Sequence, residues 1–185
     1  MPPIFTNLAG SAPLLTAGGV GILKTDTLHG IVARADSEAA VERVFMLKTR
    51  TPTKSPIVLI SSVDQLFDTY DTTTLAFLND YWPGPYSIIL PSTNAPAWLT
   101  RGNNSVAYRL PDDEALRSLI ATTGPLIAPS ANPETLQPAA TIREAQEYFG
   151  KSVDFYVDSG EVAIDAPPSR LLRYDIHSGD FERLR

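Results

Sequence analysis

The sequence predicts an α/β fold, in which helices flank a β-sheet. Short apolar runs alternate along the chain with amphipathic stretches, and several of these runs are apolar at every position. Strands that are buried on both faces have this pattern, so we expect helices to cover the sheet. With 185 residues, 43% of them hydrophobic and 19% charged, the chain is expected to form a single domain over residues 1–185.

Six apolar runs are typical of strands because each is short and bounded by more polar sequence. The expected strands cover residues 19–23, 56–60, 86–90, 105–110, 125–130 and 154–158. Near the end of the chain, the segment HSGD at 177–180 is typical of a hairpin turn. It predicts an antiparallel pair of strands there.

The first expected helix can begin at Asp36 or Ser37, because either side chain can cap it and the apolar residues that follow recur at the helical period. This helix is expected to end near Lys48. Further helices are predicted over residues 73–81, 113–122 and 141–149. The last of these begins with Thr141 and Glu144 at the spacing of a capping box.

The segment GGVGILKT at 18–25 resembles a phosphate-binding loop, but that loop needs a glycine directly before its lysine. Leu23 stands at this position, so a strand with glycines for close packing or a turn is the better interpretation. The following KTDTLHG, residues 24–30, lies just after a buried strand, where α/β proteins commonly bind ligands. A turn in which Thr and Asp serve as local acceptors explains the segment equally well.

A cationic turn stands out in a chain whose net charge is −6. Lys48, Arg50 and Lys54 lie within seven residues, and no acidic residue occurs between Arg43 and Val63. Cations at a helix C-terminus can simply complement the helix dipole. That explanation suits Lys54 poorly, because it lies beyond the helix, and a site for a polyphosphate is the alternative. These residues alone leave both explanations open.

Composition excludes several other classes. The absence of cysteine gives no sign of disulfides, and a pI of 4.8 argues against a broad nucleic-acid-binding surface. His29 and His177 are far apart in sequence, which is poor material for a zinc site. No basic leader or apolar run of membrane-spanning length is present, so we expect a cytoplasmic protein that does not enter the membrane.

Five segments together carry a resemblance to a known family. They are KTDTLHGI at 24–31, KTRTPTK at 48–54, YWPGPYSIIL at 81–90, SVAYRLPDDEAL at 105–116 and PLIAPSAN at 125–132. Their order and spacing resemble the YrdC/Sua5 family of threonylcarbamoyl-AMP synthases from about Gly18 to about Tyr174. The resemblance implies a YrdC-like twisted mixed sheet, flanked by helices, with an open concave site.

The resemblance also implies an activity, that of a nucleotidyltransferase. Such an enzyme makes threonylcarbamoyl-adenylate and pyrophosphate from L-threonine, bicarbonate or CO2, and ATP with Mg2+, for the modification of tRNA to N6-threonylcarbamoyladenosine. A tRNA or a transferase of that modification is a possible partner. Both reacting groups are anions, so positioning and charge neutralisation are expected to supply most of the catalysis.

By the same resemblance, Lys48 and Arg50 are the expected catalytic residues. The residues implied to bind ATP or its phosphates are Lys48, Arg50, Lys54, Arg109, Ser130, Asn132 and Ser169. The residues implied to bind threonine are Thr25, Thr27, His29 and Arg109. Metal ligands cannot be assigned from the sequence.

The chain departs from the family pattern at several positions. Lys24, His29 and Asp113 replace a proline, an aromatic residue and a histidine, and the family's Ser-Gly after S-A-N is missing from PETLQP, residues 133–138. Two alternatives therefore stay open. One is a divergent or non-catalytic relative that binds nucleotide or RNA, and the other is a carbamoyl transfer like that of the related domain in hydrogenase-maturation proteins.

Overall fold

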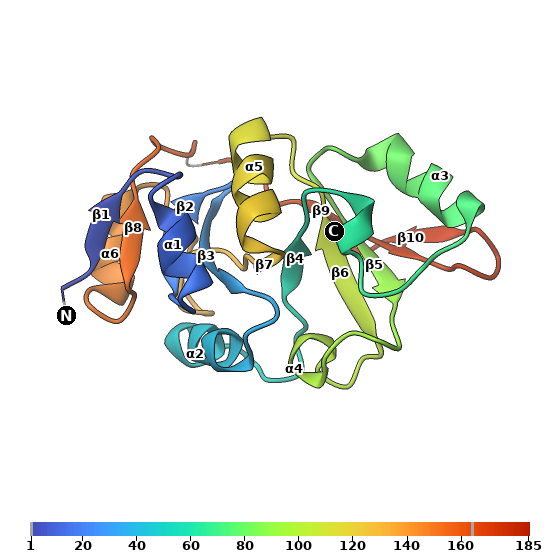
Figure 1. Cartoon of the computed structure of the whole chain (residues 1–185), viewed down its shortest axis with the longest axis horizontal. Coiled ribbons are helices and arrows are strands. Elements are labelled where there is room, and N and C mark those ends of the chain that lie inside the picture. Colours follow the sequence, from blue (N-terminus) through green and yellow to red (C-terminus); the bar gives the residue numbers. More distant parts are fainter. Residues whose placement is uncertain (1, 164) are drawn as a thin grey trace.

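The computed structural model describes residues 2–163 and 165–185. The strands in this part of the chain are β1 (Ile4–Thr6), β2 (Gly21–Lys24), β3 (His29–Arg34), β4 (Ile57–Leu59), β5 (Tyr86–Pro91), β6 (Ser105–Arg109), β7 (Leu126–Ile127), β8 (Phe155–Val157), β9 (Arg170–Tyr174) and β10 (Phe181–Arg183). They form one sheet in the order β1-β8-β2-β3-β7-β4-β6-β5-β9-β10 (Figure 1). Parallel and antiparallel pairs both occur, so the sheet is mixed: β4 runs parallel to β6, whereas β5 runs antiparallel to it.

The helices are α1 (Ser11–Thr16), α2 (Glu38–Lys48), α3 (Thr72–Tyr81), α4 (Ala97–Thr100), α5 (Glu114–Thr123) and α6 (Ile142–Phe149). Side-chain caps explain several of their starts. Ser37 accepts a hydrogen bond from the backbone of residue 40, and Asp113 does the same for residue 116. Thr141 caps α6 as predicted, but the Glu144 carboxylate accepts from the backbone N–H of Ala140, one residue before the Thr141 N–H that a capping box uses.

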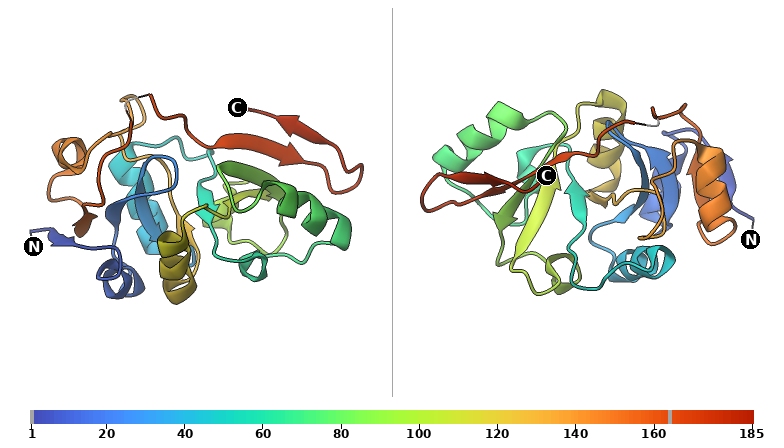
Figure 2. Two further views of the ribbon diagram at one scale, coloured as in Figure 1. Left: turned by 90° about the horizontal axis from the view of Figure 1, so that it is seen from above. Right: turned by 180° about the vertical axis from the view of Figure 1, so that it is seen from behind.

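The sheet buries both of its faces. Neighbouring residues of one strand belong to different apolar clusters: Ile22 and Val58 lie in one cluster, and Leu23 and Leu59 in the other. Helices α1 and α5 pack against the second cluster, while α2 and α6 contribute to the first. Figure 2 shows α1 and α5 on one side of the sheet and α6 on the other. The predicted α/β class, with helices flanking a mixed sheet, is therefore confirmed.

Most of the predicted elements are present, with ends that shift by a few residues. The expected antiparallel pair near residues 177–180 is confirmed as β9 and β10. The segment 18–25 contains strand β2, and a Cβ added to Gly21 would lie 2.3 Å from the ring of Phe155. This glycine therefore permits close packing, as predicted. Strands β1 and β3 and helices α1 and α4 were not predicted from the sequence.

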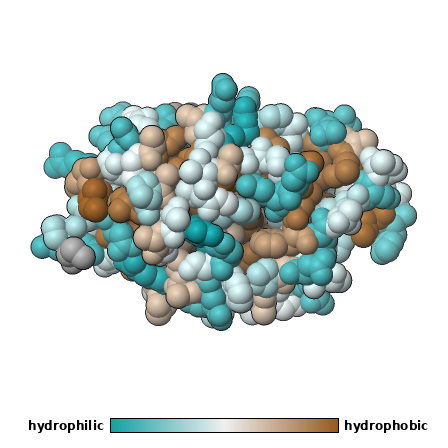
Figure 3. All heavy atoms as spheres, viewed as in Figure 1, coloured by the Kyte–Doolittle hydropathy of each residue, from teal (hydrophilic) through white to brown (hydrophobic). Residues whose placement is uncertain are grey.

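The surface mixes hydrophilic side chains with smaller hydrophobic areas on the face shown in Figure 3. Within the described residues, no helix combines the length and the apolar character needed to cross a membrane.

Candidate active site

The cationic turn follows directly from the end of α2. Thr49 adopts a left-handed conformation with φ of 49°, which ends the helix and reverses the chain. The Arg50 guanidinium then donates to the backbone oxygens of Lys54 (3.3 Å) and Ser55 (3.1 Å) and lies 5.5 Å from the ring centre of Phe45. These contacts fix Arg50 beside a cavity of about 580 Å3 that Lys54 also lines.

Lys48 is almost fully buried, with 2% of its surface exposed. Its ammonium donates to the backbone oxygens of Ser130 and Asn132, and to the side-chain oxygen of Asn132 at 3.2 Å. Burial lowers the pKa of Lys48 to about 7. Lys48 therefore ties the loop after β7 to the C-terminus of α2, across more than eighty residues of sequence.

The loop after β7 is held rigidly by its own polar groups. Ser130 forms a bridge to Gly30 of β3, and its hydroxyl donates to the side-chain oxygen of Asn132 at 2.6 Å. The Asn132 amide donates to the backbone oxygen of Pro133 at 2.9 Å and to that of Leu136. Ser130 lines a cavity of about 730 Å3, whereas the buried Asn132 side chain makes its hydrogen bonds within the loop.

A second polar group lies at the turn between β2 and β3. The Thr25 hydroxyl donates to the backbone oxygen of Leu28 at 2.7 Å and lies 3.2 Å from the hydroxyl of Thr27. Arg109, at the end of β6, donates to the same Thr25 hydroxyl at 3.3 Å and pairs with Asp26 at 3.1 Å. Burial raises the pKa of Asp26, and the charge of Arg109 offsets only part of this rise. Asp26 and Thr27 line a cavity of about 520 Å3.

Three positions that depart from the family pattern have local contacts in the fold. His29 is fully buried in β3, its Nδ1 lies 3.2 Å from the backbone oxygen of Ala139, and burial lowers its pKa. It is not among the residues that line the three cavities described above. Lys24 donates to the backbone oxygen of Glu161 at 2.8 Å, and Asp113 is the cap of α5.

Arg185 lies where the three cavities adjoin, and it was not predicted as a site residue. Arg185 lines all three cavities: the one of about 580 Å3 with Lys54, the one of about 730 Å3 with Ser130, and the one of about 520 Å3 with Asp26. The Arg185 guanidinium donates to the backbone oxygen of Ser169 at 3.0 Å and to its hydroxyl at 3.4 Å. The predicted hairpin was the available signal, because it returns the chain beside β9.

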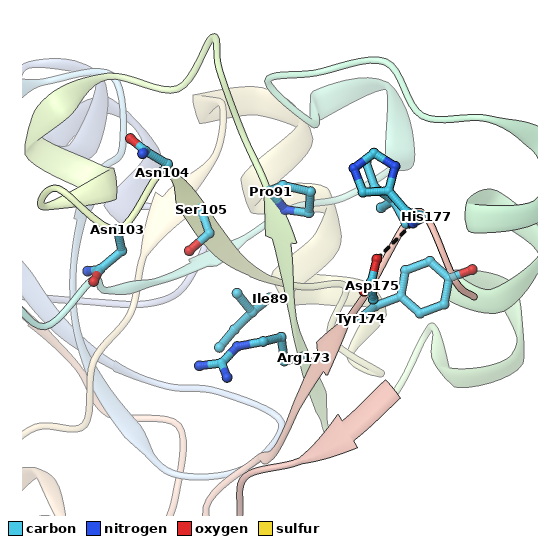
Figure 4. A pocket seen from close by; sticks show the side chains of 10 residues that line it. Ile89, Pro91, Asn103, Asn104, Ser105, Arg173, Tyr174, Asp175 and His177 are labelled. Atoms are coloured by element: carbon cyan, nitrogen blue, oxygen red, sulfur yellow. Dashed lines mark hydrogen bonds between the residues drawn. The ribbon is translucent and has the colours of Figure 1, made fainter. Parts of the chain in front are cut away.

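A fourth cavity adjoins the one beside the cationic turn. This cavity, of about 340 Å3, shares Ile89, Asn103, Ser105 and Arg173 with the one beside the cationic turn. Figure 4 shows Asn103 and His177 on opposite sides of this fourth cavity. Some of the expected site residues line these cavities, namely Thr27, Arg50, Lys54, Ser130 and Ser169. The others are held in the walls or loops behind them, namely Thr25, His29, Lys48, Arg109 and Asn132.

Lys54 has a partner that the sequence did not predict. Its ammonium forms an ion pair with Glu134, which lies two residues after Asn132. Glu134 was missed because only the fold brings the 130–134 loop to this turn.

Comparison with solved structures defines the class of the fold. The crystal structure of P. abyssi Sua5 complexed with L-threonine matches with a TM-score of 0.87 and 27% identity. The match covers 98% of this chain and 57% of that chain, so the present chain spans little more than half of that protein. YciO of E. coli matches with a TM-score of 0.83 over 98% of this chain and 92% of that chain; at 16% identity this shows the fold alone.

Sequence comparison gives the family. The Sua5/YciO/YrdC family model, described as telomere recombination, matches residues 13–180. The chain belongs to this family. A threonylcarbamoyl-AMP synthase of Marinobacter nauticus is 33% identical over 183 residues, which cover 96% of this chain and 95% of that protein. One of Xanthomonas oryzae pv. oryzae is 34% identical over 183 residues, covering 95% and 96%.

Proposed function

We propose that this protein is a threonylcarbamoyl-AMP synthase, a nucleotidyltransferase that makes the activated intermediate for N6-threonylcarbamoyladenosine in tRNA. The observation that carries the proposal is the meeting of three cavities at Arg185. One is bordered by the cationic turn, one by the loop after β7, and one by the Thr25–Leu28 turn. Relatives named for this activity, similar over nearly their whole length, support the same conclusion.

The reaction joins two anions. The amino group of threonine adds to CO2 and loses a proton, which gives a carbamate. A carbamate oxygen then attacks the α-phosphorus of ATP, the bond from that phosphorus to the bridging oxygen breaks, and pyrophosphate leaves. Two unit charges about 4 Å apart repel by roughly 4 kcal/mol at an effective dielectric constant of 20. Cations that neutralise the phosphates remove much of this cost.

The triphosphate is best accommodated in the cavity beside the cationic turn. This cavity is lined by Arg50, Lys54 and Arg185, each of which brings a positive charge. The reaction needs no covalent nucleophile. Ser130 lines the adjoining cavity; its hydroxyl proton is donated to Asn132, so its oxygen can accept a hydrogen bond from the nucleotide. Lys48 acts in our proposal by holding the loop that carries Ser130, since its ammonium is bound to that loop. Asn132 supports the same loop.

Threonine is best accommodated in the cavity bordered by Asp26, Thr27 and Ser169. Arg109 fixes the Thr25 hydroxyl and the Asp26 carboxylate, and so shapes this end of the site. Arg185 separates this cavity from the phosphate side and can contact both reactants. In our proposal His29 contributes indirectly, through its contact with Ala139, which lines the adjoining cavity of the loop after β7.

Other features of the proposal concern the surroundings of the reaction. Mg2+ enters with ATP, because proteins commonly hold it through substrate phosphates and water with one or two carboxylates. Among the described residues, no three His, Asp or Glu side chains gather as a metal site. We propose one domain over residues 1–185, because strands from both ends of the chain belong to one sheet. A cytoplasmic location and a tRNA or transferase partner complete the proposal.

The test is pyrophosphate release by the purified protein. Release is expected to require L-threonine, bicarbonate and MgATP together, and the adenylate should appear by mass spectrometry. Arg50→Ala is expected to lower the rate strongly, whereas Arg143→Ala, on the exposed face of α6, should not. Pyrophosphate release that is independent of threonine, or ATP binding without any release, would contradict the proposal.

A further inference from the structure

The Glu134 carboxylate is bound by the cationic turn itself. One of its oxygens accepts hydrogen bonds from the Thr51 backbone N–H (2.7 Å) and the Thr51 hydroxyl (3.0 Å). The other oxygen accepts from the Lys54 ammonium. These hydrogen bonds lower the pKa of Glu134 to about 2, so the carboxylate is charged throughout the neutral range.

This set of donors is also what a phosphate group uses. A backbone N–H, a hydroxyl and an ammonium converge on anionic oxygens, and phosphate oxygens bind such donors as carboxylate oxygens do. Of these donors only Lys54 lines the cavity beside the turn; neither Thr51 nor Glu134 is among the residues that line it. The same ammonium therefore has two possible anionic partners, one in the cavity and one in the loop.

Only the Glu134 side chain has to move for the exchange. The Glu134 backbone N–H donates to the backbone oxygen of Lys48 at 2.8 Å, and that of Leu136 donates to Pro133 at 3.0 Å. These contacts do not involve the carboxylate, so they hold the loop when the side chain turns away. The Glu134 side chain is 24% exposed and its partner Lys54 is 57% exposed, so the displaced carboxylate can enter water near its present position.

We infer that Glu134 is an internal competitor for nucleotide phosphate: its carboxylate holds the Lys54 ammonium, and a phosphate in the cavity must displace the carboxylate from that ammonium. Glu134 thereby sets the affinity of the site for nucleotide. This rests on the proposed function, in which phosphates occupy the cavity beside the turn. Glu134 also lies in the segment PETLQP, where the resemblance to the family's Ser-Gly pattern is lost.

Two other roles for Glu134 predict the opposite effect. If the carboxylate is a clamp that keeps the turn in its binding conformation, removing it weakens nucleotide binding. If the carboxylate helps to hold the Mg2+ of MgATP, removing it weakens binding only when Mg2+ is present. Competition alone predicts tighter binding after removal, with and without Mg2+.

The experiment is calorimetric titration of ATP, with and without Mg2+, into the wild-type protein and Glu134→Gln. In the variant, ATP no longer has to break an exposed charge pair and its hydrogen bonds, so it should bind about threefold to tenfold more tightly. Glu147→Gln is the matched control, because Glu147 is an exposed residue of α6 and lies 3.8 Å from Arg143. It should bind ATP like the wild type. Adenosine, which has no phosphate, should bind both proteins equally.

The Lys54→Ala variant tests whether the effect of Glu134→Gln on ATP affinity depends on Lys54. With Lys54 absent, Glu134→Gln should change ATP affinity much less, because the contested ammonium is gone. Equal or weaker ATP binding by Glu134→Gln overturns the inference, and so does a gain that persists in full without Lys54. Thermal unfolding of each variant checks that a lower affinity does not come from misfolding.

The inference and the proposed function can fail separately, because the binding test needs neither threonine nor pyrophosphate release. Wild-type protein that binds ATP but is not improved by Glu134→Gln contradicts the inference alone. Tighter binding by Glu134→Gln without any threonine-dependent release contradicts the function alone. Protein that binds no ATP in any variant contradicts both.

Discussion

Lys48 gives a pH dependence of stability that can be measured directly. Burial lowers the pKa of this ammonium to about 7 in the folded protein, whereas an unfolded lysine titrates near 10.4. Between these two values the unfolded chain binds a proton that the folded protein does not. The free energy of unfolding should therefore rise with pH across this window, and this contribution is lost as the pH falls towards 7.

The size of the effect follows from the two pKa values. The slope approaches about 1.4 kcal/mol per pH unit once the folded lysine is neutral and the unfolded one is still charged. From about pH 7.5 to about pH 9, this amounts to about 2 kcal/mol. Lys48→Met removes this contribution while keeping a side chain of similar length. It also leaves the backbone oxygens of Ser130 and Asn132 without their shared donor.

The assay is urea unfolding of the wild type and Lys48→Met at both pH values, followed by tryptophan fluorescence. Other titrating groups are common to both proteins, so they cancel in the difference between the two pH responses. Lys151→Met, at an exposed lysine, is the control and should respond like the wild type. If the free energy of unfolding of the wild type rises no more than that of Lys48→Met between the two pH values, the reasoning is refuted.

Two further predictions concern catalysis and packing. Arg185→Ala should lower kcat/KM for pyrophosphate release about tenfold to a hundredfold, because one preorganised charge next to both reactants is lost. An unchanged rate, relative to the exposed control Arg143→Ala, would remove Arg185 from the site. Gly21→Ala should lower the free energy of unfolding by about 1–3 kcal/mol, because its Cβ would collide with the ring of Phe155. Gly30→Ala, whose Cβ would have its nearest contact at 3.4 Å, is the control, and an equal loss in both variants would contradict the packing argument.

The fold class could be predicted because it depends on local signals. Helix α2 follows the Ser37 cap and ends at Lys48, as the apolar period and the capping residue predicted. Strand β7 is shorter than predicted, because Pro125 and Pro129 lack the N–H that a central strand donates. Strand β3 was missed because its first residues, His29 and Gly30, have the composition of a loop. Its pairing with β2 and β7 decides its structure, and the sequence does not show that pairing.

The site was predicted less well, because its contacts join distant parts of the chain. Lys48 meets Ser130, and Lys54 meets Glu134, across eighty or more residues. Family resemblance placed these segments in one site, but it did not show which side chains would form hydrogen bonds or ion pairs with one another. Arg185 carries no motif of its own, and its place among the cavities depends on the β9–β10 hairpin.

The electrostatics of the site indicate how its cations divide their roles. Lys48 is buried, its ammonium is bound to the loop after β7, and it does not line the cavity beside the turn, so it is a poor source of charge for phosphates there. Its three acceptors explain it as an anchor for the loop after β7. Arginine stays protonated in proteins, so Arg50 and Arg185 keep their charge beside the cavity. Catalytic loss in Lys48 variants should therefore come from a displaced Ser130 loop, whereas loss in Arg50 variants should come from uncompensated phosphate charge.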